Sequence, residues 1–175
     1  MTLRAETDPT SALRGALTPH AHTPMVTLTE PREIGNLLNV IDGYEGWQPR
    51  RFGLLFAAHT FVRPNEVRLA HWSEIDLEDA CWSIPAERMK MKRPHLVPLS
   101  PQAVVILNKV RRITGSNEWV FPSVRRMDKP LVYTDFIRVL KQLGFNGRMT
   151  PHGFRAMAST ILNERGFRSD VIERQ

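Results

Sequence analysis

The spacing of apolar residues changes twice along this chain of 175 residues, and this limits the folds it can adopt. Over residues 29–70, and again from residue 100 onward, apolar side chains recur with the period of an amphipathic helix. Over residues 75–99 they alternate with polar side chains, which is typical of half-buried strands. We therefore predict an α+β fold that is mainly α-helical and contains a small antiparallel sheet of three short strands.

Capping residues and prolines indicate where the helices begin. We expect helices that begin at or next to Thr29, Pro49, Pro64, Ser100, Thr134, Thr150 and Ser169. Because Pro64 suits the first position of a helix, Arg63 is predicted to be the N-cap of a short helix over residues 64–70. Gly43 is expected to end the first helix.

The first part of the chain has no apolar period. Residues 1–28 are rich in Thr, Pro, Ala, His and Arg, and proline punctuates them at three places. This composition is typical of an extended arm or an interdomain linker. Since 175 residues give room for one domain with a proper core, we predict one folded domain over residues 29–175.

The charge balance indicates the class of partner. Lys and Arg outnumber Asp and Glu by 24 to 18, which gives a formal net charge of +6 and a pI near 10.1. A basic balance of this size favours a polyanionic partner, most often nucleic acid. An ordinary protein with solvated basic faces is the alternative.

Cysteine usage and hydropathy bear on the location of the protein. Cys81 is the only cysteine, so no disulfide forms within one chain, as is usual in a reducing cytoplasm. The first residues lead into no apolar run, and the longest apolar stretch, residues 53–62, is interrupted by His59. It is too short to span a membrane, so we predict a cytoplasmic location and no membrane partner.

Four separated positions suit the handling of a phosphodiester: Arg63, Lys90, His152 and Arg155. The transition state of phosphodiester transfer builds negative charge on the non-bridging oxygens, which two guanidinium groups can clamp bidentately. A lysine and a histidine can move the protons. Taken singly, each position has a common explanation, such as an Arg–Glu pair, an exposed hairpin or a polar helix face.

Basic residues gather at the tip of the predicted hairpin between the second and third strands. Alternation along a strand would place Lys90 and Lys92 on the same side. A lysine there can protonate a leaving oxygen, and Arg88, Lys92 and Arg93 are predicted to contact DNA phosphates. Glu66 lies three residues after Arg63 and is expected to orient its guanidinium.

The sequence offers no metal-binding pattern. His59 and His71 are accompanied by no HExxH, CxxC or paired Cys/His spacing. The acidic residues over 74–78 alternate with apolar ones, as in a half-buried strand. We therefore predict metal-free chemistry without a cofactor.

Three segments taken in order resemble the catalytic domain of the tyrosine recombinase (phage integrase) family. They are residues 61–68 (FVRPNEVR), 89–100 (MKMKRPHLVPLS) and 150–156 (TPHGFRA). The sequences of these segments are most similar to those of integrases of prophages and genomic islands. The resemblance runs over residues 29–175 and implies the fold of DNA breaking-rejoining enzymes.

The resemblance also implies a mechanism. Family members cut one strand of double-stranded DNA with a tyrosine, form a 3′-phosphotyrosyl link, and let a second DNA hydroxyl attack it, without metal or cofactor. Arg63 and Arg155 would then hold the non-bridging oxygens, Lys90 would protonate the leaving 5′-oxygen, and His152 would assist proton transfer. Lys92 is the alternative to Lys90, because the register of the hairpin is open. Other recombinase subunits would be partners on the DNA.

The sequence departs from the family after Arg155. There the family has another His or Trp and then the nucleophilic Tyr, whereas Gln175 comes before either. The two tyrosines, Tyr44 and Tyr133, lie upstream of His152. We therefore expect the site without its nucleophile, and no activity from this chain alone. The alternatives are a non-catalytic DNA-binding or regulatory fragment of a decayed integrase and, less favoured, a type IB topoisomerase.

Overall fold

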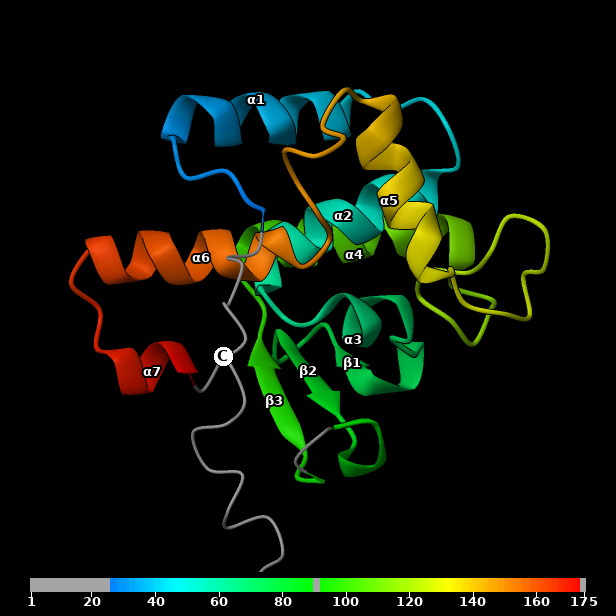
Figure 1. The fold of residues 1–175 in the computed structure, drawn as a ribbon. Coiled ribbons are helices and arrows are strands. Elements are labelled where there is room, and N and C mark those ends of the chain that lie inside the picture. Colours follow the sequence, from blue (N-terminus) through cyan, green and yellow to red (C-terminus); the bar gives the residue numbers. More distant parts are fainter. Residues whose placement is uncertain (1–25, 90–91, 174–175) are drawn as a thin grey trace, which may run out of the picture.

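The computed structural model describes residues 26–89 and 92–173, which form a layer of helices above a small sheet (Figure 1). The strands are β1 (Ile75–Asp76), β2 (Cys81–Ile84) and β3 (His95–Pro98). The α-helices are α1 (Pro31–Asp42), α2 (Gln48–Thr60), α3 (Pro64–Arg68), α4 (Pro101–Thr114), α5 (Tyr133–Gln142), α6 (Gly153–Glu164) and α7 (Ser169–Glu173). The predicted α+β fold with a mainly helical content is confirmed.

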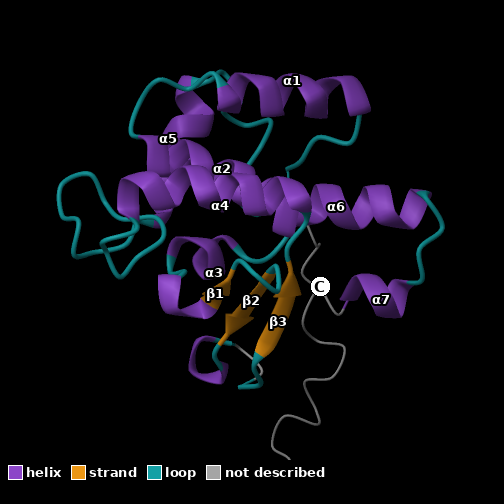
Figure 2. Ribbon diagram, turned by 180° about the vertical axis from the view of Figure 1, so that it is seen from behind, coloured by secondary structure: helices purple, strands orange, loops and turns teal. Residues whose placement is uncertain are grey.

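The sheet is antiparallel, in the order β1-β2-β3, and lies below the helical layer beside α3 (Figure 2). In β2, Trp82 and Ile84 are buried whereas Ser83 is exposed. This alternation is the one that the sequence predicts for a half-buried strand. Trp82 pairs with Val97 of β3 and turns its ring to Phe56 of α2, 5.5 Å away between ring centroids.

Helix α2 runs through the centre of the helical layer and packs against α1, α4 and α5. Its glycine explains how closely α5 approaches, because a Cβ on Gly53 would lie 2.8 Å from Cε1 of Phe136. Phe56, one turn further, is fully buried between Trp82 and Phe121. The core therefore joins the helical layer to the sheet through α2.

The predicted helix starts agree with the structure only where a single capping residue or proline marks the start. Ser100 Oγ accepts a hydrogen bond from the backbone N–H of Ala103 at 3.2 Å, as expected of an N-cap. The prediction that Thr29 caps α1 is wrong, because the helix begins at Pro31 and Glu30 is its N-cap. Proline at the first helical position has a preset φ angle and needs no N–H partner, so it fixes this start.

The start of α5 is corrected in the same way. The predicted cap Thr134 lies inside the helix, which begins at Tyr133. The carboxylate of Asp135 reaches back and accepts a hydrogen bond from the N–H of Val132 at 3.1 Å. The buried carboxylate of Asp135, at the third helical position, thus accepts the free N–H of the N-cap residue, and no capping Thr is needed for it.

The segment before α1 packs on the start of α6. Thr27 Oγ1 donates a hydrogen bond to the carbonyl of Gly153 at 2.7 Å, and Leu28 is buried in the core. Residues 1–25 lie outside the described part of the chain, so the predicted arm or linker stays a prediction there.

Membrane insertion of a helix finds no support in the described ranges. None of the helices in residues 26–89 and 92–173 is both long enough and apolar enough to cross a bilayer.

Candidate active site

Arg63 takes its place from a sharp change of chain direction after α2. Phe61 follows the last residue of the helix with φ +56°, in the left-handed region, and its N–H bonds to the carbonyl of Ala57 at 3.0 Å. Two residues later Arg63 is extended and is the N-cap of α3, as predicted. The strained turn at Phe61 therefore directs the chain from the central helix into the short helix that carries Arg63.

Glu66 holds Arg63 from two sides. Its Oε2 accepts the backbone N–H of Arg63 at 2.7 Å, and its Oε1 accepts Nη1 of the guanidinium at 2.9 Å. The carboxylate is buried, with 7% of its side chain exposed, whereas 41% of the Arg63 side chain is exposed. The guanidinium is thus fixed at one edge and keeps further N–H groups for a ligand.

Arg155 reaches the same place from α6. Its Nη1 donates to the carbonyl of Phe61 at 3.1 Å, across 94 positions of the sequence. The pKa of Arg155 is lowered, first by partial burial and then by the positive charge of Arg63, while Glu66 raises it. Two guanidinium groups and one carboxylate therefore share this site, which leaves it one positive charge in excess for an anion.

His152 stands at the N-cap of α6, one turn before Arg155. The backbone N–H of Arg155 bonds to the carbonyl of His152 at 3.1 Å, so both residues belong to the same first turn. This end of a helix carries partial positive charge, which favours an anion. The two guanidinium groups thus meet at the turn between α2 and α3, and His152 belongs to the same first turn of α6 as Arg155.

Tyr133 is a neighbour of the site that the sequence did not indicate. Its ring lies 6.1 Å from the ring of His152, between centroids, at an angle of 46°. Burial raises the pKa of Tyr133 above its ordinary value. No local sequence signal indicates this contact, because it depends on how α5 packs against the start of α6.

Gly153 in the His-x-x-Arg segment has a packing reason. A Cβ there would lie 2.8 Å from the carbonyl oxygen of Val26 and 2.9 Å from Sδ of Met149. Its N–H also bonds to Thr150 Oγ1 at 3.0 Å, which closes the turn before α6. The absence of a side chain lets the segment before α1 lie directly against the helix that carries His152 and Arg155.

The hairpin differs from its prediction. β2 ends at Ile84, and a 3-10 turn, Ala86–Arg88, follows in place of a longer strand. Pro85 lacks the N–H that would continue the ladder, and its carbonyl accepts the N–H of Arg88 at 3.1 Å. In the described residues β2 ends at Ile84, and the predicted alternation of Lys90 and Lys92 stays a prediction because Lys90 lies outside the described residues.

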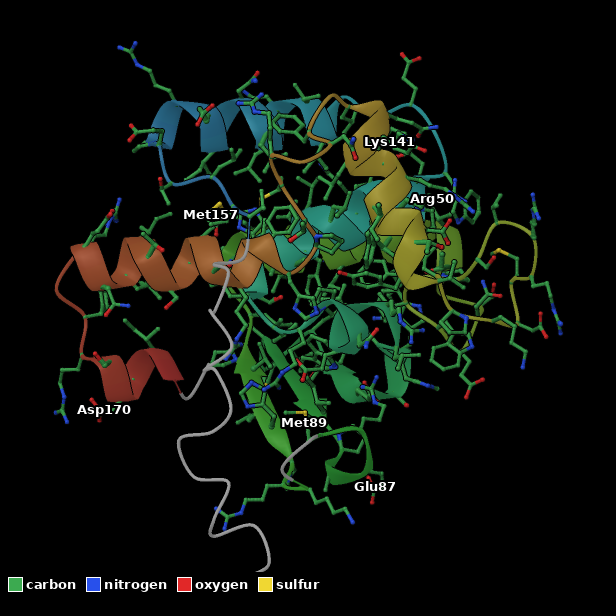
Figure 3. The ribbon with its side chains drawn as sticks, in the orientation of Figure 1. Arg50, Glu87, Met89, Lys141, Met157 and Asp170 are labelled. Carbon is green, nitrogen blue, oxygen red and sulfur yellow. The ribbon has the colours of Figure 1, made fainter. Side chains whose placement is uncertain are left out.

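The basic residues of the hairpin have separate fates. Lys90 lies outside the described residues, so its predicted place in the site stays a prediction. Lys92 and Arg93 are exposed, and Lys92 has φ +49°. Glu87 projects away from the protein at the end of the hairpin, and Met89 lies nearer its base (Figure 3).

Arg88, expected to contact DNA, is bonded within the protein. Its guanidinium donates to the carbonyl of Leu69, at the end of α3, and to Oε2 of Glu74. The same Glu74 oxygen accepts Nε1 of Trp82 at 3.0 Å, and only 19% of the Arg88 side chain is exposed. This geometry favours a tie between the base of the hairpin and α3; the DNA contact of Arg88 stays untested.

A small cavity connects this tie to the candidate site. It has a volume of about 170 Å³ and is lined by Arg63, Asn65, Glu66, Leu69 and Arg88. Its charged lining consists of two arginines and one carboxylate.

In the described ranges no group of three or more His, Cys, Asp or Glu side chains is placed to hold a metal ion.

The phage integrase family model matches residues 28–175, and the chain belongs to this family. It is similar to the integrase of Enterobacteria phage P4, with 34% identity over 97% of this chain and 42% of that protein. It is also similar to the prophage integrase IntA of Escherichia coli (strain K12), with 45% identity over 65% of this chain and 28% of that protein. The chain thus spans less than half the length of these relatives.

Solved structures with low sequence identity show the same fold. The Tn1549 transposon integrase, in complex with transposon right end DNA, gives a TM-score of 0.75 at 15% identity, covering 97% of this chain and 63% of that chain. The XerA recombinase gives a TM-score of 0.68 at 20% identity, covering 90% of this chain and 56% of that chain. The helical layer and small sheet are therefore those of a tyrosine recombinase catalytic domain.

Proposed function

We propose that this chain binds double-stranded DNA and holds the phosphate that is cleaved during site-specific recombination or integration. Arg63 and Arg155 bind the non-bridging oxygens, and His152 moves a proton at the same phosphate. The observation that carries the proposal is the meeting of Arg155 with the Arg63–Glu66 pair across the carbonyl of Phe61. Membership of the phage integrase family supports it.

The electrostatics of the site suit a transition state better than a ground state. Charge on the non-bridging oxygens increases as the attacking and leaving oxygens share the phosphorus. Glu66 and a backbone carbonyl already hold the two guanidinium groups in place. These groups therefore stabilise the negative charge without reorganisation. By the family resemblance, Lys90 protonates the leaving 5′-oxygen, with Lys92 as the alternative.

We propose further that neither Tyr44 nor Tyr133 attacks the DNA phosphate to form a 3′-phosphotyrosyl intermediate. Tyr133 is close to His152 but lies upstream of it, whereas the tyrosine of the family follows the His-x-x-Arg segment. Tyr44 packs over Gly46 in the loop after α1, where a Cβ on the glycine would lie 2.2 Å from the tyrosine hydroxyl oxygen. The attacking tyrosine is then supplied from outside residues 1–175, and other recombinase subunits assemble with the chain on DNA.

The DNA-binding part of the proposal is tested by salt titration. Fluorescence anisotropy with a labelled duplex of about 25 base pairs gives the affinity at several salt concentrations. The Arg63→Gln/Arg155→Gln variant should reduce the slope of log affinity against log salt by about 2, one for each lost phosphate contact. A slope unchanged from that of the unsubstituted chain overturns the assignment of these two arginines.

The nucleophile is tested by trapping. A nicked duplex releases a short strand after cleavage and leaves any phosphotyrosyl adduct stranded, so a denaturing gel detects it. We expect no adduct from this chain. An adduct that disappears with Tyr133→Phe, but not with Tyr44→Phe, would identify Tyr133 as the attacker and contradict the proposal.

A second candidate function follows from the same tyrosine count. The sequence has two tyrosines, both before His152, which favours a non-catalytic DNA-binding or regulatory role as the alternative. Co-expression with an intact integrase of the same target site should then reduce recombination by competition. Unchanged recombination at equal expression levels contradicts this role.

A further inference from the structure

The side chain of His152 takes no part in capping α6, although His152 occupies the N-cap position. An N-cap side chain usually accepts a hydrogen bond from a backbone N–H of the first turn, which fixes its orientation. Here the N–H of Gly153 bonds to Thr150 instead, to Oγ1 at 3.0 Å and to the carbonyl at 2.9 Å. The imidazole is thus free to face a ligand, and another contact has to keep it in one orientation.

Tyr133 supplies this contact from the first residue of α5. Its ring lies 6.1 Å from the ring of His152, between centroids, at an angle of 46°. Aromatic pairs favour tilted or offset rings about 4.5–7 Å apart, so the arrangement is an attractive one. Within residues 26–89 and 92–173, neither ring nitrogen of His152 has a hydrogen-bond partner. The ring of Tyr133 is therefore what the imidazole rests against.

The position of Tyr133 is fixed by the residues on either side of it. Before it, the carbonyl of Leu131 accepts the guanidinium of Arg68, a residue of α3, at 3.4 Å. After it, the buried carboxylate of Asp135 accepts the N–H of Val132 at 3.1 Å. The start of α5 is thus tied to the short helix that follows the first arginine of the site, and the ring of Tyr133 projects from a preformed backbone.

The surroundings of Tyr133 predict which substitutions would remove the contact. Tyr133 lines a cavity of about 130 Å³ together with Ile137 of the same helix and residues 146, 147 and 149–151 before α6. Partial burial raises the pKa of the phenol. A leucine in place of Tyr133 is shorter, extends this cavity and leaves no ring beside His152, whereas a phenylalanine keeps the ring.

We propose that Tyr133 is a positioning residue, whose ring holds the imidazole of His152 toward the phosphate bound by Arg63 and Arg155. The inference rests on the proposed function and deepens it, because it gives a role to a residue outside the His-x-x-Arg segment. Proton transfer requires a narrow geometry between the reacting groups, and a side chain whose orientation is locked by packing provides it. Since the contact is one of shape, the ring of Tyr133 is sufficient and its hydroxyl is not required.

NMR relaxation of the His152 ring tests this positioning. Its C–H signals are assigned by comparison with His152→Gln, and their relaxation gives an order parameter. We expect a rigid ring in the unsubstituted chain and in Tyr133→Phe, and an order parameter below about 0.6 in Tyr133→Leu. Ile137→Ala is the matched control, because Ile137 lines the same cavity one turn further along α5 and has no aromatic ring to offer. This variant should leave the order parameter unchanged.

Addition of a duplex of about 25 base pairs gives a second measurement on the same signals. The His152 signals should move with DNA in the unsubstituted chain and in Tyr133→Phe, and should move less in Tyr133→Leu. Smaller movement in Tyr133→Leu with full movement in Tyr133→Phe is rescue by the conservative variant, which supports the ring contact.

The other outcomes overturn the inference in recognisable ways. A His152 ring that stays rigid in Tyr133→Leu excludes the contact, and equal loss of order in Ile137→Ala indicates a general loosening of α5. Loss of order in Tyr133→Phe shows that the ring is not sufficient. A rigid ring whose signals do not move with DNA contradicts the proposed function, and with it the direction toward the phosphate, although Tyr133 still holds the ring. Circular dichroism confirms that every variant is folded.

Discussion

At the scale of single residues, the site depends on groups that hold the cations in place. Arg63 is fixed by the buried carboxylate of Glu66, and Arg155 by the carbonyl of Phe61. The carbonyl of Phe61 points to Arg155 in a left-handed turn, which an aromatic residue adopts only at a cost in energy. Such local strain at a backbone contact to Arg155 is consistent with a functional position.

Removing the charge of Glu66 should destabilise the fold. Glu66→Gln weakens two charge-assisted hydrogen bonds in a buried place, so we expect a loss of about 1–3 kcal/mol in the free energy of unfolding. Urea denaturation followed by tryptophan fluorescence measures it. Glu33→Gln is the matched control, since Glu33 forms an exposed ion pair with Arg148 whose loss should cost less than about 1 kcal/mol. Equal losses in the two variants would contradict the role of Glu66.

His59 should make stability depend on pH. Burial lowers the pKa of His59 below its ordinary value, so the folded state resists its protonation. Stability is therefore unaffected by His59 above its unfolded pKa, near 6.5, and decreases as the pH falls below that value, because the unfolded chain takes up the proton first. We expect His59→Gln to flatten this part of the pH dependence of the unfolding free energy. An unchanged dependence would show that another group carries it.

At the scale of elements, α2 determines how the site is assembled. It packs against α1, α4 and α5, and its last residue leads through Phe61 to α3 and Arg63. At Gly53 the helix lies close to Phe136 of α5. Since α5 also brings Tyr133 to His152, the spacing between α2 and α5 affects the site directly.

Two glycine substitutions separate packing from helix propensity. Gly53→Ala places a Cβ 2.8 Å from Phe136 Cε1, and such overpacking costs about 1–3 kcal/mol, more than the roughly 1 kcal/mol that alanine gains in a helix. Gly35→Ala in α1 meets nothing within 4 Å and should stabilise by about 0.5–1 kcal/mol. Thermal unfolding measures both. Stabilisation by Gly53→Ala would contradict the close approach of α5.

Elements were predictable where one local signal acts alone. Pro64 and Ser100 mark helix starts that the structure confirms, and the alternation around Trp82 predicts β2. Thr29 and Thr134 failed because Pro31 and Asp135 satisfy the same helix ends by other means. At the hairpin, the described part of β2 ends before Pro85, whereas the predicted alternation of Lys90 and Lys92 stays a prediction because Lys90 lies outside the described residues.

At the scale of the whole molecule, the site unites segments that lie far apart in the sequence. The segments around Arg63 and His152 were found from their residue types and order. The hydrogen bond from Arg155 to Phe61 and the contact of Tyr133 with His152 were not predictable, since both arise only when α5 and α6 pack on α2. Arg88 is of a residue type that often contacts DNA, but its hydrogen bonds lie within the protein. Only the tertiary structure distinguishes these two roles.

The basic charge of the chain is likewise distributed by the fold. Some arginines, such as Arg50 and Arg88, form ion pairs with carboxylates that are largely buried, whereas Arg125 and Lys129 are exposed. The net charge of +6 therefore does not indicate where on the surface positive charge is available. The described surface near α5 and the start of α6 is where we expect DNA to lie.

Nitrogen-15 NMR of the arginine side chains tests the central claim most directly. Spectra of the Nε–Hε groups, assigned by single Arg→Lys variants, are recorded as a duplex of about 25 base pairs is added. The signals of Arg63 and Arg155 should move with DNA, because phosphate oxygens join their hydrogen bonds, while that of Arg112 on α4 should stay in place. Binding of DNA that leaves the Arg63 and Arg155 signals unmoved would contradict the phosphate site proposed for this protein.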